Sequence, residues 1–143
     1  MIRPYQDSDL DDLLSVWEEA SSLAHPFLGI SFREKERQSI REVYLPVAET
    51  WVWEARGRVA GFVSLLDNEI GGLFVLPTLH GSGIGRALVD HARVLHGSLE
   101  VEVFEKNSIG RAFYARYGFV EVDQKIHEPT GLTVLRLHLL ASS

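Results

Sequence analysis

The chain of 143 residues is 45% hydrophobic and 24% charged, which is typical of one globular domain, so we expect a single domain over residues 1–143. It contains no cysteine, which excludes disulfides and cysteine-bound metals and fits a cytoplasmic location. The formal net charge of −6, without clusters of Lys or Arg, argues against nucleic acid as a partner, and no apolar run is long enough to cross a membrane.

The first third of the chain has the pattern of one strand and two helices. The expected elements are a strand over residues 1–4, a helix over 8–21, a loop over 23–30, and a helix from residue 31 to a point before Pro46. Ser8 is the candidate N-cap of the first helix. Ser31, followed by Glu34, has the capping-box pattern and is the candidate N-cap of the second.

The rest of the chain alternates between strands and helices. The expected elements are strands over residues 51–53, 59–66 and 69–76, a helix from Ile84 with Leu88, Ala92 and Leu95 on its apolar face, a strand over 98–104, a helix over 107–117, and strands over 119–124 and 132–140. The resulting order, β-α-α-β-β-β-α-β-α-β-β, predicts a mixed sheet covered by helices.

Three alternating glycines, Gly81, Gly83 and Gly85, lie between the strand that Pro77 ends and the helix that follows. Free amides and the helix dipole at such a helix start favour a bound phosphate, and glycines let it approach. A nucleoside-triphosphate loop would need Gly-Lys-Ser/Thr, and the dinucleotide fingerprint would need a glycine where Arg86 stands. The alternative is that the glycines only permit a tight turn.

Two motifs resemble those of the GNAT superfamily of N-acetyltransferases. The segment from His80 to Leu88 resembles its acyl-CoA pyrophosphate loop, Arg/Gln-x-x-Gly-x-Gly/Ala, with His80 in place of Arg or Gln. The second motif, with Gly110 where Ala is usual, is Asn107-x-x-Gly110-x-x-Phe113-Tyr114-x-x-x-Gly118-Phe119. The resemblance implies an α/β (α+β) fold with a mixed, mostly antiparallel central sheet of about seven strands, flanked by about four helices.

The same resemblance implies acetyl-CoA as the acyl donor. The amides from Gly81 to Arg86 would hold the pyrophosphate, the strand end at residues 73–75 would pair with the pantetheine arm, and the Val75 N–H would face the thioester carbonyl. Asn107 would hydrogen-bond to the pantetheine. The residues expected to contact the donor are Leu73, Phe74, Val75, Gly81, Ser82, Gly83, Ile84, Gly85, Arg86, Asn107 and Tyr114.

Tyr114 resembles the family's general acid, which protonates the departing thiolate, and a phenol is protonated at pH 7. On its own, a tyrosine at helical spacing would be interpreted as a core residue. Glu69 is the candidate base, because several members that acetylate proteins carry a glutamate at this distance before the loop. Its alternative is a solvated charge at a strand end, and Asp67 is a weaker candidate for the base.

The acceptor site is expected to involve Trp17, His25, Phe27 and Trp53, because in this family the first two helices and their connecting loop line it. Trp51 and Trp53 point the same way from their strand, and at least one of them is expected in the core. His25 is a candidate base, substrate contact or packing residue. The six histidines show no metal-binding spacing, so no metal is expected.

The predicted function is transfer of acetyl from acetyl-CoA to a primary amine, by direct attack in a ternary complex. The favoured acceptor is a lysine or N-terminus of a protein or peptide, since the loop between the first two helices is short and predicts an open groove. The alternatives are a small amine (a polyamine, amino acid or antibiotic) and a non-catalytic acetyl-CoA-binding module. We expect a monomer or homodimer without a membrane partner.

Overall fold

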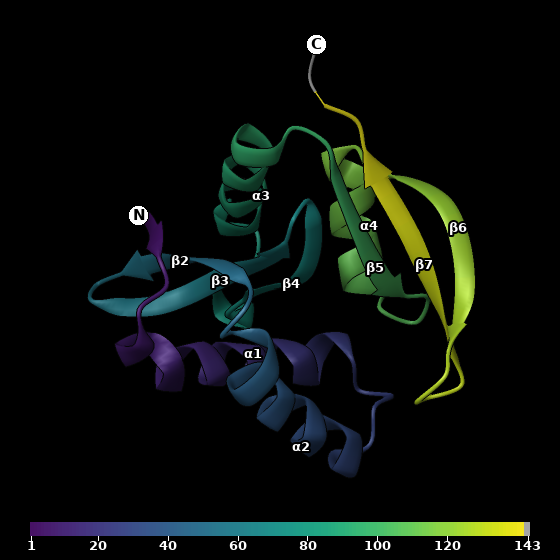
Figure 1. Ribbon diagram of the computed structural model, residues 1–143, viewed down its shortest axis with the longest axis horizontal. Coiled ribbons are helices and arrows are strands. Elements are labelled where there is room, and N and C mark those ends of the chain that lie inside the picture. Colours follow the sequence, from purple (N-terminus) through teal and green to yellow (C-terminus); the bar gives the residue numbers. More distant parts are fainter. Residues whose placement is uncertain (142–143) are drawn as a thin grey trace.

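The structure is a computed structural model that describes residues 1–141 (Figure 1). Its helices and strands are β1 Ile2–Pro4, α1 Leu10–Ala24, α2 Ile30–Ser39, β2 Glu49–Ala55, β3 Arg58–Leu66, β4 Glu69–Val75, α3 Ile84–His96, β5 Leu99–Phe104, α4 Ser108–Tyr117, β6 Val120–His127 and β7 Leu132–Leu139. A π-helical turn, Ile40–Tyr44, follows α2. This order confirms the sequence prediction. No helix within residues 1–141 combines the length and the apolar character that a membrane span requires.

The strands form one sheet in the order β1-β2-β3-β4-β5-β7-β6. Neighbouring strands are antiparallel except for β4 and β5, which run parallel and pair only through Glu69 with Glu100 and Ile70 with Val101. In Figure 1, β2, β3 and β4 run across the view, whereas β5, β7 and β6 run steeply down it. The sheet is therefore split beyond Ile70, where β4 and β5 no longer pair.

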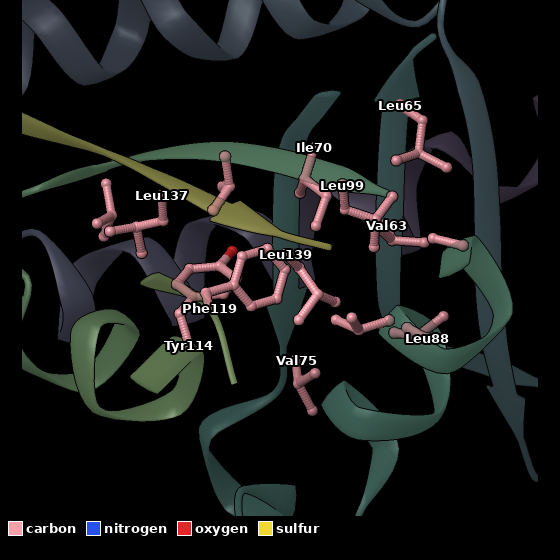
Figure 2. Close-up of a cluster of buried hydrophobic side chains, with 14 of the residues drawn as sticks. Val63, Leu65, Ile70, Val75, Leu88, Leu99, Tyr114, Phe119, Leu137 and Leu139 are labelled. Atoms are coloured by element: carbon pink, nitrogen blue, oxygen red, sulfur yellow. The ribbon is translucent and has the colours of Figure 1, made fainter. Parts of the chain in front are cut away.

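One face of the sheet carries the larger hydrophobic core, under α3 and α4. Alternate residues of β5 point into it, as the sequence predicted, because a strand's side chains alternate between faces. Figure 2 shows this cluster, with Tyr114 and Phe119 beside residues of the central strands. Its members include Val63, Leu65, Ile70, Val75, Leu88, Leu99, Val101, Val103, Tyr114, Phe119, Leu137 and Leu139.

The other face is covered mainly by α1, which lies over β3 and β4. Leu13, Leu14 and Trp17 of α1 are buried there against Val52 and Phe62. On the same face, β5 and β7 carry charged side chains that remain partly exposed: Glu100, Glu102 and Arg136. The half of this face beyond the split thus carries partly exposed charges, and the loop after α1 packs His25 and Phe27 against Phe104 at the end of β5.

Two predicted N-caps are wrong. The short 3-10 turn Asp7–Asp9 precedes α1, and the Asp9 carboxylate accepts the backbone N–H of Gln6 at 2.8 Å, so Ser8 lies inside the turn. Arg3 holds that carboxylate with two hydrogen bonds of 2.8 Å. Helix α2 begins one residue earlier than expected, with Gly29 as its N-cap, so Ser31 lies within it. The start of α1 therefore depends on Asp9, which Arg3 of the preceding strand β1 holds in place.

The apolar face of α3 is also shorter than expected. Ile84, Leu88 and Ala92 are buried, but Leu95 is 47% exposed. The helix ends at His96, with Gly97 as its C-cap. Leu95 therefore belongs to the last turn, which extends beyond the core.

Candidate active site

The glycine-rich turn between β4 and α3 leaves space and free amides for an anion. Gly81 and Gly83 have φ angles of +83° and +92°, and a Cβ on either would meet nothing within 4 Å. Gly83 is the N-cap of α3, so the N–H groups of Ile84, Gly85 and Arg86 precede the first hydrogen bond inside the helix. Free amides, the helix dipole and absent side chains together favour a phosphate at this point.

Two other residues of this turn have different roles. A Cβ on Gly85 would lie 3.2 Å from the Phe113 ring, so this glycine lets α4 pack closely against the start of α3. The Ser82 hydroxyl donates to the Leu79 carbonyl within the turn itself, at 2.5 Å. Ser82 does not line the cavity described below, and its N–H also donates to the Leu79 carbonyl, at 3.2 Å, so both its hydroxyl and its N–H have partners within the turn.

His80 ties the glycine-rich turn to the end of β4. Its Nε2 lies 3.0 Å from the Val75 carbonyl oxygen, and because a carbonyl only accepts, the ring donates. The side chain that replaces Arg or Gln thus has a structural partner in the strand.

The end of β4 directs backbone groups into the split of the sheet. The Leu76 N–H donates to the Ala60 carbonyl of β3 at 2.9 Å. Because backbone groups alternate in direction along an antiparallel strand, those of Val75 and Leu73 point away from β3, toward the split. The backbone groups of Phe74 point at β3, so Phe74 offers its side chain and not its backbone.

A cavity of about 670 Å³ runs through the split. At one end it is lined by the glycine-rich turn, α3 and α4, and at the other by α1, α2 and the π-helical turn. The middle is lined by β4 from Ile70 to Val75 and by β5 from Val101 to Phe104. The two sides of the sheet are therefore connected at the point where β4 and β5 separate.

Tyr114 lines this cavity from α4. The residue is only 7% exposed and packs edge-on against Phe113 and Phe119. Figure 2 shows it beside Phe119. Its hydroxyl makes no hydrogen bond within the part of the chain that the structure describes. Burial raises the pKa of this hydroxyl above its ordinary value, so it keeps its proton at neutral pH. Tyr114 is both a core residue and a protonated group at the cavity wall.

Asn107 and His25 join α4 to α1 through a buried chain of hydrogen bonds. Asn107 is the N-cap of α4, and its Oδ1 accepts the Gly110 N–H at 2.8 Å. Its Nδ2 lies 3.2 Å from His25 Nε2, and His25 Nδ1 lies 3.3 Å from the Ser21 hydroxyl. Because an amide nitrogen only donates, Nε2 must accept, and the imidazole proton must lie on Nδ1.

This arrangement decides between the roles considered for His25. Burial, with a smaller effect from the Arg33 charge, lowers its pKa from 6.5 to about 4, so the ring is neutral at pH 7. Its one free lone pair is already used by Asn107. His25 is therefore a cavity-lining residue that positions Asn107, and it has no free nitrogen with which to act as a base.

The same contacts explain the unusual Gly110. A Cβ at this position would lie 2.5 Å from Asn107 Nδ2, so an alanine would displace the side chain that caps α4. The departure from the Ala of the related motif follows from the side-chain conformation that Asn107 adopts.

Glu69 begins β4, as predicted, and lies beside an arginine. Its Oε1 is 3.4 Å from Arg136 Nη2, and Arg136 also pairs with Glu100 at 3.1 Å. The Glu69 side chain is 40% exposed and does not line the cavity, although the next residue, Ile70, does. It is available to a group that enters from the α1 face of the sheet.

The aromatic residues expected at the acceptor site separate into three groups. Trp17 lines the cavity and is 2% exposed, so it forms a rigid wall. Phe27 packs edge-on against His25 and Phe104, which line the cavity, but does not line it itself. Trp53 lies on the α3 face of the sheet, so its placement at the acceptor site is corrected.

The reason for the Trp53 error is the alternation of β2. Val52 is the residue that points toward α1, which sends Trp51 and Trp53 to the opposite face. Sequence reasoning also missed cavity residues from α2, the π-helical turn and β5: Glu36, Ser39, Ile40, Tyr44 and Glu102. The consecutive glycines Gly71-Gly72 inside a strand were a usable signal, since they indicate a bulge or a close neighbour.

The donor side of the cavity fits the expected acyl-CoA. An open glycine cradle lies at a helix start, and backbone groups of Leu73 and Val75 face the split where an added strand-like chain would lie. Asn107 lines the same passage, although its Oδ1 and one Nδ2 proton already have protein partners. Within residues 1–141, no group of three or more His, Asp or Glu residues is arranged to hold a metal ion.

Comparison with known proteins agrees with this geometry. The model of the acetyltransferase (GNAT) domain matches residues 46–121. The peptidyl-lysine N-acetyltransferase YiaC of Escherichia coli strain K12 is 35% identical over 133 residues, which cover 92% of this chain and 91% of YiaC. The peptidyl-lysine N-acetyltransferase YjaB of the same strain is 31% identical over 119 residues, 82% of this chain and 80% of YjaB.

Solved structures show the same architecture. The solution structure of apo YjaB from Escherichia coli has a TM-score of 0.88 with 27% identity, over 99% of this chain and 98% of that one. The PaiA N-acetyltransferase from Thermoplasma acidophilum, solved in complex with coenzyme A, has a TM-score of 0.77 over 95% of this chain and 96% of PaiA. At 18% identity, PaiA shows a shared fold alone.

Proposed function

This chain belongs to the GNAT acetyltransferases and is an N-acetyltransferase that uses acetyl-CoA, and from this premise we propose that its acceptor is the side-chain amine of a lysine in a protein. The observation that carries the proposal is the cavity through the split sheet, which is lined by residues of α1, α2 and the π-helical turn as well as by the glycine-rich turn. A long, thin side chain can occupy the part beside the helices while the donor occupies the part beside the glycine-rich turn. Two relatives above 30% identity bear the name peptidyl-lysine N-acetyltransferase, which supports the same acceptor.

The donor is held mainly by backbone groups in this proposal. The free amides of Ile84, Gly85 and Arg86 bind the pyrophosphate, and Gly81 and Gly83 provide the space for it. Acetyl-CoA supplies the acetyl group as a thioester, which an amine can attack. The N–H groups of Leu73 and Val75 face the split, where they can stabilise negative charge on the thioester oxygen.

Tyr114 provides the proton for the departing sulfur. Its hydroxyl stays protonated because burial raises its pKa, and no protein group within residues 1–141 competes for its proton. A fixed, protonated phenol at the cavity wall is suited to general acid catalysis. Phe113 and Phe119 restrict the ring, so it needs no reorganisation during the reaction.

Glu69 receives a proton from the acceptor in this proposal. A lysine amine has a pKa near 10.4 and is mostly charged at pH 7, so it must lose a proton before it attacks. The Glu69 carboxylate lies on the α1 face of the sheet next to Ile70 of the cavity wall, where a water molecule could connect it to the amine. Arg136 keeps the carboxylate in place.

The amine attacks the thioester directly. The chain has no cysteine, so the most reactive side chain for an acetyl-enzyme is missing. The shape of the cavity also allows both reactants to be bound at once, which converts the reaction into one between neighbours.

The acceptor class is tested by a thiol-release assay with acetyl-CoA and a matched panel. The panel holds lysine peptides, the same peptides with the lysine replaced by norleucine, free N-terminal peptides, and small amines. We expect saturable turnover with the lysine peptides and its loss with norleucine. Saturable turnover confined to the small amines or to the free N-termini would contradict the lysine proposal.

A further inference from the structure

Tyr44 lies against a bulge in β4, at the acceptor end of the cavity. β3 pairs Ser64 with Gly72 and Leu65 with Ile70, which leaves Gly71 as the extra residue of the bulge. A Cβ on Gly71 would collide with the hydroxyl and the ring of Tyr44. Gly71 is therefore a glycine because the tyrosine occupies the space that a side chain would need.

The backbone that carries Tyr44 has an uncommon conformation. Tyr44 is the last residue of the π-helical turn Ile40–Tyr44, which the Leu45 N–H closes by donating to the Ile40 carbonyl at 2.9 Å. Such turns are rare in proteins, and many of those that do occur lie at functional sites. Ile40 and Tyr44 both line the cavity, together with Glu36 and Ser39 of α2.

The Tyr44 hydroxyl is buried and has no hydrogen-bond partner within the described residues 1–141. A buried hydroxyl without a partner costs free energy, so its retention calls for a ligand that supplies one. Burial, and to a smaller degree the nearby Glu69 charge, raises the pKa of Tyr44 to about 12. The phenol is therefore neutral at physiological pH, with oxygen lone pairs that can accept an N–H.

We propose that Tyr44 is a substrate-binding residue whose hydroxyl oxygen accepts a hydrogen bond from the amine of the acceptor lysine. The inference rests on the proposed function, because the lysine side chain is the group expected to enter this end of the cavity. The negative charge of Glu69 attracts the ammonium group to the same place. The bulge at Gly71 provides the room that the Tyr44 hydroxyl occupies.

The test is Tyr44→Phe in the full chain, which removes one oxygen and keeps the ring over Gly71. We expect the KM for a lysine peptide to rise roughly 10-fold, as for loss of a hydrogen bond in a desolvated site, with kcat changed by less than about 2-fold. The acetyl-CoA affinity, measured by calorimetry, should be unchanged. Tyr5→Phe is the matched control, because Tyr5 lies outside the cavity and this variant should match the wild type.

A second variant tests the same contact from the strand. Gly71→Ala should push the Tyr44 ring aside and raise the acceptor KM to a similar degree. In the double variant the two effects should not add, because the hydroxyl can be lost only once. Additive effects would show that Gly71 acts without Tyr44 and would contradict the proposal.

These outcomes separate the Tyr44 proposal from the lysine proposal. An unchanged acceptor KM in Tyr44→Phe, with lysine peptides turned over normally, would overturn the role of Tyr44 alone. If the wild type acetylates only small amines, the lysine acceptor is wrong. The Tyr44→Phe comparison then uses the best small amine, where a raised KM supports the amine contact and an unchanged KM refutes it.

Discussion

The donor and acceptor ends of the cavity are formed by different kinds of groups, from differently arranged parts of the chain. The donor end combines backbone groups from two contiguous segments, the end of β4 and the turn from Gly81 to Arg86, with side chains of α4. The acceptor end consists of single side chains from α1, α2, the π-helical turn and β5, which are far apart in the sequence. A phosphate site made of backbone amides requires glycines at fixed spacing, whereas many different side chains can line a cavity. The donor end is therefore recognisable in the sequence, and the acceptor end becomes visible only in the fold.

The largest expected effect is at the donor end. Gly83→Asp places a side chain on a residue with φ of +92° and a negative charge where the phosphates bind. We expect acetyl-CoA affinity, measured by calorimetry, to fall by more than about 100-fold. Gly29→Asp is the matched control, because Gly29 is an N-cap with free space around it and an aspartate is favoured there. Normal affinity in a folded Gly83→Asp protein would remove the turn from donor binding.

Tyr114→Phe comes next, and it separates chemistry from binding at the donor end. Loss of the general acid should lower kcat by roughly 10²–10⁴-fold. Acetyl-CoA affinity should stay close to that of the wild type, because the ring and its packing on Phe119 are kept. Single-turnover rates and calorimetry on the same preparation measure both quantities. A variant with normal kcat would leave Tyr114 as a core residue only.

Glu69→Gln tests the point where the two ends meet, and its expected effect is smaller. Glu69 is partly exposed, and water can replace it, so we expect the rate at pH 7 to fall by roughly 10²-fold, the lower limit for acid–base catalysis. Raising the pH should restore part of the rate, since more of the lysine amine is then deprotonated. The pH–rate profiles of both proteins on one lysine peptide measure this. Parallel profiles of equal height would remove Glu69 from the mechanism.

His25→Gln has the smallest expected effect and concerns the link between the two ends. A glutamine oxygen can still accept from Asn107, so the free energy of unfolding at pH 7 should fall by only about 1 kcal/mol. Below pH 6.5 the unfolded chain binds a proton at His25, but the folded protein does so only near pH 4. The wild type should therefore lose stability as the pH falls from 6.5 toward 4.

Urea unfolding at pH 7 and pH 5 measures that difference. Between these pH values the wild type should lose about 1–2 kcal/mol more than His25→Gln, because the variant has no imidazole to protonate. Equal losses in both proteins would show that His25 is not held in the neutral form by the fold.

The sequence predicted the element order and the strand alternation of β5, because local spacing determines both. Gly81, Gly83 and Tyr114, which all line the cavity, were proposed from the resemblance of two motifs. It failed for Ser8, since the start of α1 depends on the hydrogen bonds between Asp9 and Arg3 of β1, which a capping pattern does not include. It failed for Trp53, because the face of the sheet on which this side chain lies depends on which residue of β2 packs against α1. Tyr44 was not found because its importance depends on the bulge at Gly71, a contact between residues of a helix end and a strand.

The central claim is that donor and acceptor occupy the two ends of one cavity together and react directly. Initial rates with acetyl-CoA and a lysine peptide, each varied at several fixed concentrations of the other, test it most directly. We predict that the double-reciprocal lines intersect, as they do when both reactants must be bound before acetyl is transferred. Parallel lines, with an acetylated enzyme that can be isolated after incubation with acetyl-CoA alone, would contradict the account.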